Sequence, residues 1–363
     1  MFLHNNLKKS FRYFIISLIL TAYQVPCDAA KGTVNILTRQ GYLKSPEIAS
    51  AIRNECGVEI SYDEYDSGLE CYKKFSTAAE NFYYYDIIIF PALVYELIKQ
   101  KTAIKNSDLN KVVKEYSHDV KSHYLLQNYP SSVVYFTLPF FGFVWNPKVI
   151  ELSTNDTIYE MFKKAKNNIV IVSASASGIV NLVDNDGKLA HNLYAETFAK
   201  IIGDANIYIS NGFNVLYDKD NFAFALQRSG DAVSIMKASK NEALAFFIHP
   251  LYSYVYPDLM AELNDKPETR CVARVLASKK ILDIVQKESY YLSPYGTYQL
   301  VKETAFQKVY KQFFNNIHKI KWIDSFLLYS RDLNEASKLQ KMWDEIYLLP
   351  QVRKNNSLLL RSR

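Results

Sequence analysis

The chain has 363 residues, a formal net charge of +6 and 49% hydrophobic residues, with 28 tyrosines among them. This length exceeds what one hydrophobic core usually holds, so we predict a globular protein of two domains and exclude a disordered chain. The positive charges are spread along the sequence apart from a short basic segment at 348–363, which we interpret as a solvated tail. Nucleic-acid binding would need a concentrated basic patch, so we expect no nucleic-acid partner.

The first thirty residues have the order of a secretory signal. A positive segment ending at Arg12 precedes an apolar run at 13–23, and the small residues Ala29 and Ala30 follow it. The run is about eleven residues long, against the roughly twenty that a membrane span needs. We therefore predict cleavage of a signal peptide at 1–29 and export to the periplasm. A membrane anchor, or a tether through acylated Cys27, is the alternative.

The number and spacing of the cysteines limit which metal sites and disulfides the protein can have. Cys56, Cys71 and Cys271 follow the signal, and this odd number without a Cys-x-x-Cys spacing argues against a zinc site or a disulfide scaffold. One disulfide would be compatible with an oxidising compartment, and the sequence leaves open which cysteines form it. We expect no metal and no other cofactor.

The segments after the signal alternate between strand and helix. The Ser45-Pro46-Glu47 sequence begins the first helix with a capping serine, a proline in the first turn and an early acid. Such alternation is typical of a parallel sheet covered by helices. Strands are predicted at 34–38, 58–62 and 85–90, and helices at 45–55, 70–79 and 93–98.

The middle of the chain repeats this alternation, and its last hundred residues are mostly helical. The sequence therefore predicts two α/β units. Strands are expected at 133–136, 141–145, 169–172 and 243–248, and helices at 157–166, 189–202, 221–239, 279–287, 302–317 and 333–347, the last of them anchored by Trp343.

The sequence carries none of the common catalytic motifs. It has no nucleophile elbow, phosphate-binding loop, dinucleotide fingerprint or zinc-protease motif. We therefore predict that the protein is not an enzyme and has no catalytic residues. A secreted enzyme remains an alternative, which a nucleophile and a base within hydrogen-bond reach of each other would favour.

Polar residues follow several of the predicted strands. The strand at 169–172 runs into a stretch of small residues that includes Ser173 and Ser175. Free N–H groups and hydroxyls at such a helix start could cradle an anion, or could serve simple capping. Arg39 follows the first strand and could clamp a carboxylate or phosphate, or pair with a nearby acid at 63, 64 or 66. His249 ends the strand at 243–248, at an edge where ligands collect in open α/β sheets.

Several segments, taken in order, resemble spermidine/putrescine-type periplasmic binding proteins of bacterial ABC importers. Residues 58–67 are similar to the second strand and turn of that family, and 85–100 to its third strand and helix. Residues 138–146 resemble the crossing segment between its lobes, and 342–345 resemble its closing helix. The resemblance is closer in the first half of the chain than in the second.

This resemblance implies an α/β, two-lobed periplasmic-binding-protein-like fold, with each lobe a sheet flanked by helices and the lobes joined by crossing strands. Lobe one would comprise 30–138 and 253–347, and lobe two 139–252. The solute would be held in the cleft between the lobes, and the membrane permease subunits of an ABC importer would recognise the closed form. We expect a monomer. Cleft residues implied by position or by their side chains are Arg39, Tyr42, Ser67, Phe140, Ser173, Ser175, His249 and Tyr252.

Two differences from the family bear on the solute. Members that hold polyamines have an aromatic residue where Arg39 stands, and acids where this chain has the small residues of 173–178. Burying an ammonium without a counter-charge is costly, so we expect a small anionic or zwitterionic solute. A polyamine receptor with acids from Asp66 or Asp231 is the alternative, and a receptor-like fold kept for protein interaction is another.

Overall fold

The structure is a computed structural model, and the part of it described below comprises residues 32–80, 85–102, 104, 107–172, 182–183, 189, 193–209, 215–297, 301–322, 341–342, 344–350 and 352. The expected signal peptide, the stretch with Ser173 and Ser175, Trp343 and most of the basic tail lie outside these residues.

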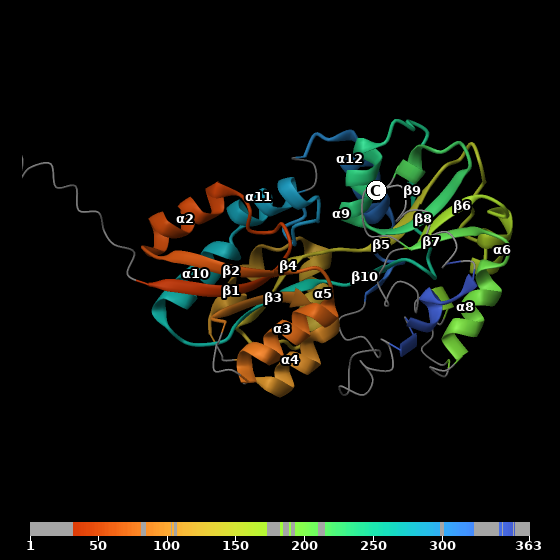
Figure 1. Ribbon diagram of the computed structural model, residues 1–363. Helices are drawn as coiled ribbons and strands as arrows, with labels where there is room; N and C mark the ends of the chain where they lie inside the picture. Colours follow the sequence, from red (N-terminus) through yellow and green to blue (C-terminus); the bar gives the residue numbers. More distant parts are fainter. Residues whose placement is uncertain are drawn as a thin grey trace, which may run out of the picture.

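Within the described residues, the molecule is built on two five-stranded sheets, which form its two lobes (Figure 1). In the first sheet the strand order is β2-β1-β3-β11-β4. β1, β2 and β3 run parallel, whereas β11 is antiparallel to both β3 and β4. The strands are β1 (Thr33–Arg39), β2 (Glu59–Tyr65), β3 (Ile87–Pro91), β4 (Val133–Thr137) and β11 (Asp258–Glu262).

The second sheet has the order β7-β6-β8-β5-β9. β6 is parallel to β7 and β8, and β5 is antiparallel to β8 and β9. In both sheets, therefore, parallel strands are combined with antiparallel ones. The strands are β5 (Phe141–Trp145), β6 (Ile169–Val172), β7 (Asn206–Ile209), β8 (Phe222–Arg228) and β9 (Ala245–Phe247).

Helices cover the sheets with their apolar sides inward. The first lobe carries α2 (Pro46–Cys56), α3 (Gly68–Glu80), α4 (Tyr95–Lys101), α5 (His118–Leu126), α10 (Pro267–Leu276) and α11 (Lys279–Ser289), with short 3-10 turns at Ala92–Val94 and Leu109–Glu115. The second carries α6 (Ile158–Lys164), α8 (Tyr194–Ile202), α9 (Ser229–Ala238) and a turn at Val215–Asp218. α12 (Thr304–Asn316) packs against α9 and β9 of the second lobe.

Local sequence signals explain where two of these helices begin and end. Pro46 occupies the first turn of α2, and Gly57 ends that helix with a φ of 67°, a left-handed conformation that glycine adopts easily. At the start of α6, the side chain of Thr157 accepts a hydrogen bond from the Glu160 backbone N–H, and the Glu160 carboxylate accepts one from the Thr157 backbone N–H.

The chain passes between the two sheets at 138–140 and 254–257, and the segment at 290–292 lies beside the first of these crossings. The N–H of Leu138 donates to the carbonyl of Leu292 at 2.8 Å, and the N–H of Tyr256 donates to the carbonyl of Pro139 at 3.0 Å. β10 (Tyr254–Val255) also pairs with β12 (Lys321–Trp322). These pairings confirm the predicted two-lobed α/β fold with joining strands.

The strands also show how the chain is divided between the lobes. Strands of the first sheet come from 33–137 and 258–262, and those of the second from 141–247. The lobe limits given above stay a prediction, although α12 lies on the second lobe and our limits place it in the first. No helix in the described ranges is long and apolar enough to cross a membrane.

One sequence-based prediction in the second lobe is wrong. We expected a single helix at 221–239, but its first part is strand β8 and only the remainder is helix α9. Residues 222–227 are all buried because β8 lies in the middle of its sheet, between β6 and β5. A strand covered on both faces lacks the alternation that would distinguish it from a helix.

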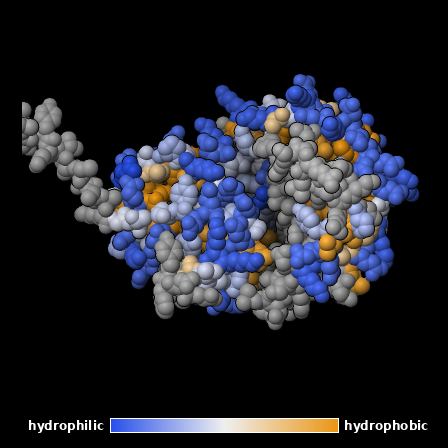
Figure 2. All heavy atoms as spheres, viewed as in Figure 1, coloured by the Kyte–Doolittle hydropathy of each residue, from blue (hydrophilic) through white to orange (hydrophobic). Residues whose placement is uncertain are grey.

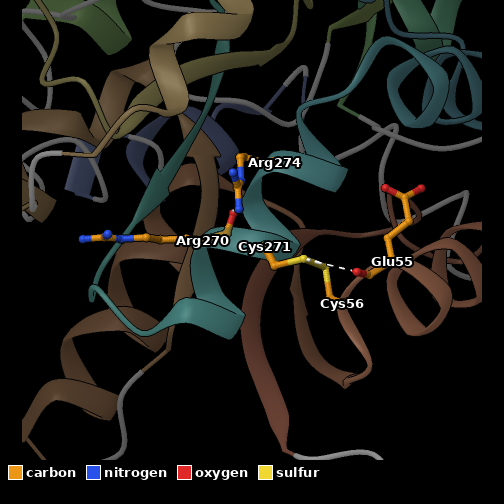
Figure 3. The surroundings of a disulfide bond; sticks show 5 residues. All are labelled: Glu55, Cys56, Arg270, Cys271 and Arg274. Atoms are coloured by element: carbon orange, nitrogen blue, oxygen red, sulfur yellow. Dashed lines mark hydrogen bonds between the residues drawn. A yellow bond between two sulfur atoms is a disulfide. The ribbon is translucent and has the colours of Figure 1, made fainter.

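A disulfide joins Cys56 at the end of α2 to Cys271 in α10 (Figure 3). The two cysteines are 215 residues apart in sequence, and their helices pack side by side. Cys71 is buried as a free thiol. The pairing that the sequence left open is therefore Cys56 with Cys271.

Candidate functional site

A buried ion pair lies at the carboxyl end of β1. The Nε of Arg39 donates to Oδ2 of Asp258 at 3.1 Å, and its Nη2 donates to Oδ1 at 3.4 Å. The side chains are 7% and 0% exposed. Arg39 is the last residue of β1 and Asp258 the first of β11, so two strands of one sheet present the pair at the same edge. The nearby acids that we considered as partners of Arg39 are not its partners here.

Two hydroxyl groups complete the surroundings of this carboxylate. The Tyr42 hydroxyl donates to Oδ2 of Asp258 at 2.5 Å and lies 2.8 Å from the hydroxyl of Thr137. The Thr137 hydroxyl also donates to Oδ2, at 3.4 Å. Burial, together with the charge of Asp258, raises the pKa of Tyr42 well above its ordinary value. The phenol therefore stays protonated and remains a hydrogen-bond donor.

Arg39 also lies over an aromatic ring. Its guanidinium carbon is 5.7 Å from the centre of the Tyr65 ring, whose hydroxyl donates to the carbonyl of Ile89. Burial lowers the pKa of Arg39, but the charge of Asp258 and the neighbouring tyrosines together outweigh this effect, so the pKa lies well above its usual value. Arg39 therefore keeps its positive charge, and its guanidinium lies over the Tyr65 ring.

A second ion pair lies at the carboxyl end of β8. The Nε of Arg228 donates to Oδ2 of Asp231 at 2.7 Å, and these side chains are 16% and 24% exposed. The Tyr291 hydroxyl donates to Oδ1 of Asp231 at 3.2 Å. Arg228 ends β8 and Asp231 lies in the first turn of α9. Arg228 and Asp231 of the second lobe, together with Tyr291 from the segment after α11, thus repeat the combination of arginine, aspartate and tyrosine found in the first lobe.

Gly230 allows the segment that carries Tyr291 to approach α9. A Cβ atom at this position would lie 2.7 Å from the carbonyl oxygen of Ser289 and 2.8 Å from the Tyr291 ring. Only glycine leaves room for this approach. The hydrogen bond between Tyr291 and Asp231 depends on it.

Tyrosines connect the two ion pairs. The Tyr291 ring lies 6.0 Å from the Tyr42 ring at 77°, an edge-to-face contact. Burial raises the pKa of Tyr256 to about 12, and this tyrosine is within electrostatic reach of both arginines and both aspartates. We call Arg39, Tyr42, Arg228, Asp231, Tyr256, Asp258 and Tyr291 the interlobe cluster. Figure 2 shows the surface hollowed between the two lobes.

Other residues singled out from the sequence have structural contacts. The exposed Ser67 accepts a hydrogen bond from the N–H of Glu70 at the start of α3. Phe140 is fully buried and stacks on Phe313 of α12 at 4.6 Å. Ser173 and Ser175 lie outside the described residues, so their predicted role stays a prediction.

His249 and Tyr252 lie together beside the start of α6. The Nε2 of His249 is 2.9 Å from the carbonyl of Asp156, and its Nδ1 accepts from the N–H of Leu251. The Tyr252 hydroxyl accepts from the N–H of Ile158, and the two rings are 4.6 Å apart. Both ring nitrogens of His249 are thus engaged with backbone groups.

Sequence reasoning missed part of the interlobe cluster. Arg228 was placed inside a predicted helix, so it was not read as a strand-end residue like Arg39. Asp231 entered only as a possible acid for a polyamine, while Tyr256 and Asp258 were not considered as site residues. The signal that could have found Arg228 is the continuous apolar run at 222–226 just before it. Such a short apolar run is compatible with a buried strand as well as with a helix, and here it is strand β8.

The sequence matches no family model and no curated protein. Solved structures do match. The spermidine/putrescine ABC transporter substrate-binding protein from Streptococcus pneumoniae has a TM-score of 0.65 and 16% identity, over 88% of this chain and 99% of its own. A lipoprotein of Treponema pallidum gives 0.63 and 13%, over 86% and 99%. The ferric binding protein from Campylobacter jejuni gives 0.59 and 17%, over 86% and 99%.

These similarities show the fold. The chain has the two-lobed fold of the substrate-binding proteins of ABC transporters, and the resemblance inferred from the sequence is confirmed at this level. The matched structures are named for different solutes, so the solute has to be argued from the interlobe cluster. In the part of the chain that is described, no group of three or more His, Cys, Asp or Glu side chains could hold a metal ion.

Proposed function

We propose that the protein is an extracytoplasmic receptor that binds a small polar solute between its lobes and delivers it to the permease subunits of an ABC importer. The observation that carries the proposal is the interlobe cluster, in which an ion pair at a strand end of each sheet is linked to the other through the contact of the Tyr42 and Tyr291 rings. Ligands of open α/β sheets collect at such strand ends. A monomer would suffice, since both halves of the cluster come from one chain.

The charges of the cluster favour an anionic or zwitterionic solute. Asp258 is held by Arg39 and two hydroxyls, and Asp231 by Arg228 and Tyr291. A polyamine would add positive charge where neither carboxylate is free, which is costly in a buried site. Asp66, the other acid considered for a polyamine, is exposed.

The disulfide supports export. A bond between Cys56 and Cys271 forms and persists in oxidising compartments such as the periplasm. We accordingly propose that 1–29 is a signal peptide and that the protein works in the periplasm, with a tether through Cys27 as the alternative.

The cluster also argues against a catalytic role. The hydroxyls of Tyr42 and Thr137 lie on Asp258, but this carboxylate is engaged by the guanidinium of Arg39. It is therefore poorly placed to take a proton from either hydroxyl, as a general base would have to do. We propose that the protein binds its solute without transforming it.

A thermal-shift screen tests the proposal. The purified protein would be heated with amino acids, organic acids, phosphate esters, ferric iron, spermidine and putrescine. A solute at about a hundred times its Kd adds about 2.7 kcal/mol to the free energy of unfolding and raises the Tm visibly. We expect a shift with an anion or zwitterion. A shift with polyamines alone would contradict the proposed solute class, and no shift with any compound would contradict the receptor itself.

A further inference from the structure

Arg228 has unused hydrogen-bond donors. A guanidinium carries N–H groups on Nε and on both Nη nitrogens. In Arg228 the Nε donates to Asp231, whereas neither Nη donates to any residue in the described ranges. The side chain is mostly buried, yet its Nη atoms are not among the fully buried unpaired polar atoms of the described residues, so they still reach water. A ligand oxyanion that replaces this water would gain charge-assisted hydrogen bonds from them.

Arg39 also has unused hydrogen-bond donors, but fewer of them than Arg228. Its Nε and Nη2 donate to Asp258, and its Nη1 makes no hydrogen bond with the residues that the structure describes. Its side chain is more deeply buried than that of Arg228. Each lobe therefore contributes one guanidinium with donors to spare.

The two ion pairs are linked by a ring contact. Tyr42, which donates to Asp258, and Tyr291, which donates to Asp231, have ring centroids 6.0 Å apart. Burial lowers the pKa of Arg228, the charge of Asp231 raises it, and Arg39 lowers it slightly, with the sum above the usual value. The influence of Arg39 places both cations within electrostatic reach. Tyr256 and Tyr291 are each within electrostatic reach of both arginines.

The remaining hydrogen-bonding capacity of the cluster is therefore mainly of the donor type. Asp258 already accepts from Arg39, Tyr42 and Thr137. Both oxygens of Asp231 also accept a hydrogen bond, one from Arg228 and one from Tyr291. A complementary ligand has to bring acceptors and negative charge, as an oxyanion does.

We propose that Arg39 and Arg228 form a two-arginine clamp, one arginine from each lobe, that holds an oxyanion of the solute between their unused Nη groups. The inference rests on the proposed receptor function and specifies its ligand. The planar guanidinium fork matches a carboxylate or phosphate group, which can accept from both arginines. Because the donors come from opposite lobes, the oxyanion binds the closed arrangement more tightly than an open one.

The charges of the interlobe cluster limit the net charge that a bound solute can carry. Two arginines and two aspartates balance, so a zwitterion leaves the buried site neutral, and a small monoanion adds a single charge. The Tyr291 hydroxyl donates to Asp231 and its ring contacts that of Tyr42, so aromatic side chains lie beside both ion pairs.

Isothermal titration calorimetry tests the clamp. The probes are L-glutamate, glycine betaine, succinate, inorganic phosphate, glycerol phosphate and spermidine, measured with the wild type, Arg228→Lys and Arg228→Gln. Arg53→Gln is the matched control, because Arg53 also pairs with a carboxylate, that of Glu59, but on the exposed surface. We expect a carboxylate or phosphate probe to bind the wild type. Arg228→Gln should weaken its binding at least about tenfold, Arg228→Lys less, and Arg53→Gln should leave the Kd unchanged.

The outcomes separate the two proposals. An unchanged Kd in Arg228→Gln, or tight binding of spermidine alone, would overturn the clamp and leave the receptor. No binding of any probe by the folded wild type would overturn the receptor proposal as well. A melting curve shows whether each variant folds, and Arg228→Lys keeps the charge opposite Asp231 if Arg228→Gln does not fold. The carboxylate and phosphate arms identify which oxyanion the clamp takes.

Discussion

The carboxylate of Asp258 accepts hydrogen bonds from Arg39, Tyr42 and Thr137 in a fully buried position. Changing Asp258→Asn would leave the buried guanidinium of Arg39 without its counter-charge. We expect a loss of about 3–5 kcal/mol in the free energy of unfolding. Urea unfolding followed by circular dichroism would measure it.

The matched control for this change is Glu59→Gln, which breaks the exposed pair with Arg53 in the same lobe. Surface pairs contribute little, so the urea midpoint of the control should barely move. If Asp258→Asn were as harmless as the control, Arg39 would have to be compensated by something other than Asp258.

His123 makes the stability of the fold depend on pH. Its Nδ1 lies 2.9 Å from the Tyr135 hydroxyl, and its ring stacks 4.0 Å from Trp322. Burial lowers the pKa of His123 to about 4, against about 6.5 in the unfolded chain. Between these values the unfolded state binds a proton that the folded state does not, so the free energy of unfolding falls as the pH falls from about 6.5 to about 4.

Urea midpoints measured from pH 7.5 to 4.5 would show this dependence. His123→Gln should make the decline shallower, because the proton-binding difference at this site disappears. His249 shifts in the same direction, since burial lowers its pKa too, so some decline should remain. A decline as steep as that of the wild type would show that His123 does not contribute.

At the scale of single residues, the sequence pointed to Arg39 and Tyr42 but not to the carboxylate that both of them contact. Arg39 and Tyr42 could be found because they directly follow a recognisable strand. Asp258 could not be assigned to Arg39, since the two are 219 residues apart and several acids lie nearer in sequence. Which carboxylate pairs with a buried arginine depends on strand order, which local pattern does not contain.

At the scale of elements, the bond between Cys56 and Cys271 fixes α2 to α10. The bond closes a long loop, and removal of a native disulfide usually costs about 2–5 kcal/mol. We expect the double variant Cys56→Ser/Cys271→Ser to unfold at a lower Tm than the oxidised wild type. Differential scanning calorimetry with and without a reductant would measure the difference.

The reductant itself provides the control. It should lower the Tm of the wild type and leave that of the double variant unchanged, because the remaining described cysteine, Cys71, is already a free thiol. An equal shift in both proteins would mean that the reductant acts elsewhere.

Helices and strands could be predicted from the sequence where a residue that starts or stops them accompanied the spacing of the apolar residues. α2 has its proline and glycine, and β3 is a continuous apolar run closed by Pro91. The segment at 222–228 lacks such a signal, since a strand buried on both faces has no alternation. The hydrogen bonds that would have identified it are formed with β5 and β6, far away in sequence.

At the scale of the whole molecule, the two-lobed architecture followed from the length, the repeated alternation and the order of the family-like segments. The approach of the Arg39–Asp258 pair to the Arg228–Asp231 pair did not, because it depends on how two separate sheets are held by the crossing segments. Those segments pair through backbone groups such as Leu138 with Leu292, and their side chains give little indication of the pairing.

The position of β11 has a consequence for the order of folding. β11 lies between β3 and β4 in the first sheet, yet it is made after every strand of the second sheet. A chain that emerges from its N-terminus, whether from a ribosome or from a secretion channel, would therefore expose all of the second sheet's strands while the first sheet still has a gap between β3 and β4. The first lobe can close only when residues 258–262 have emerged, and the same event brings Asp258 to Arg39.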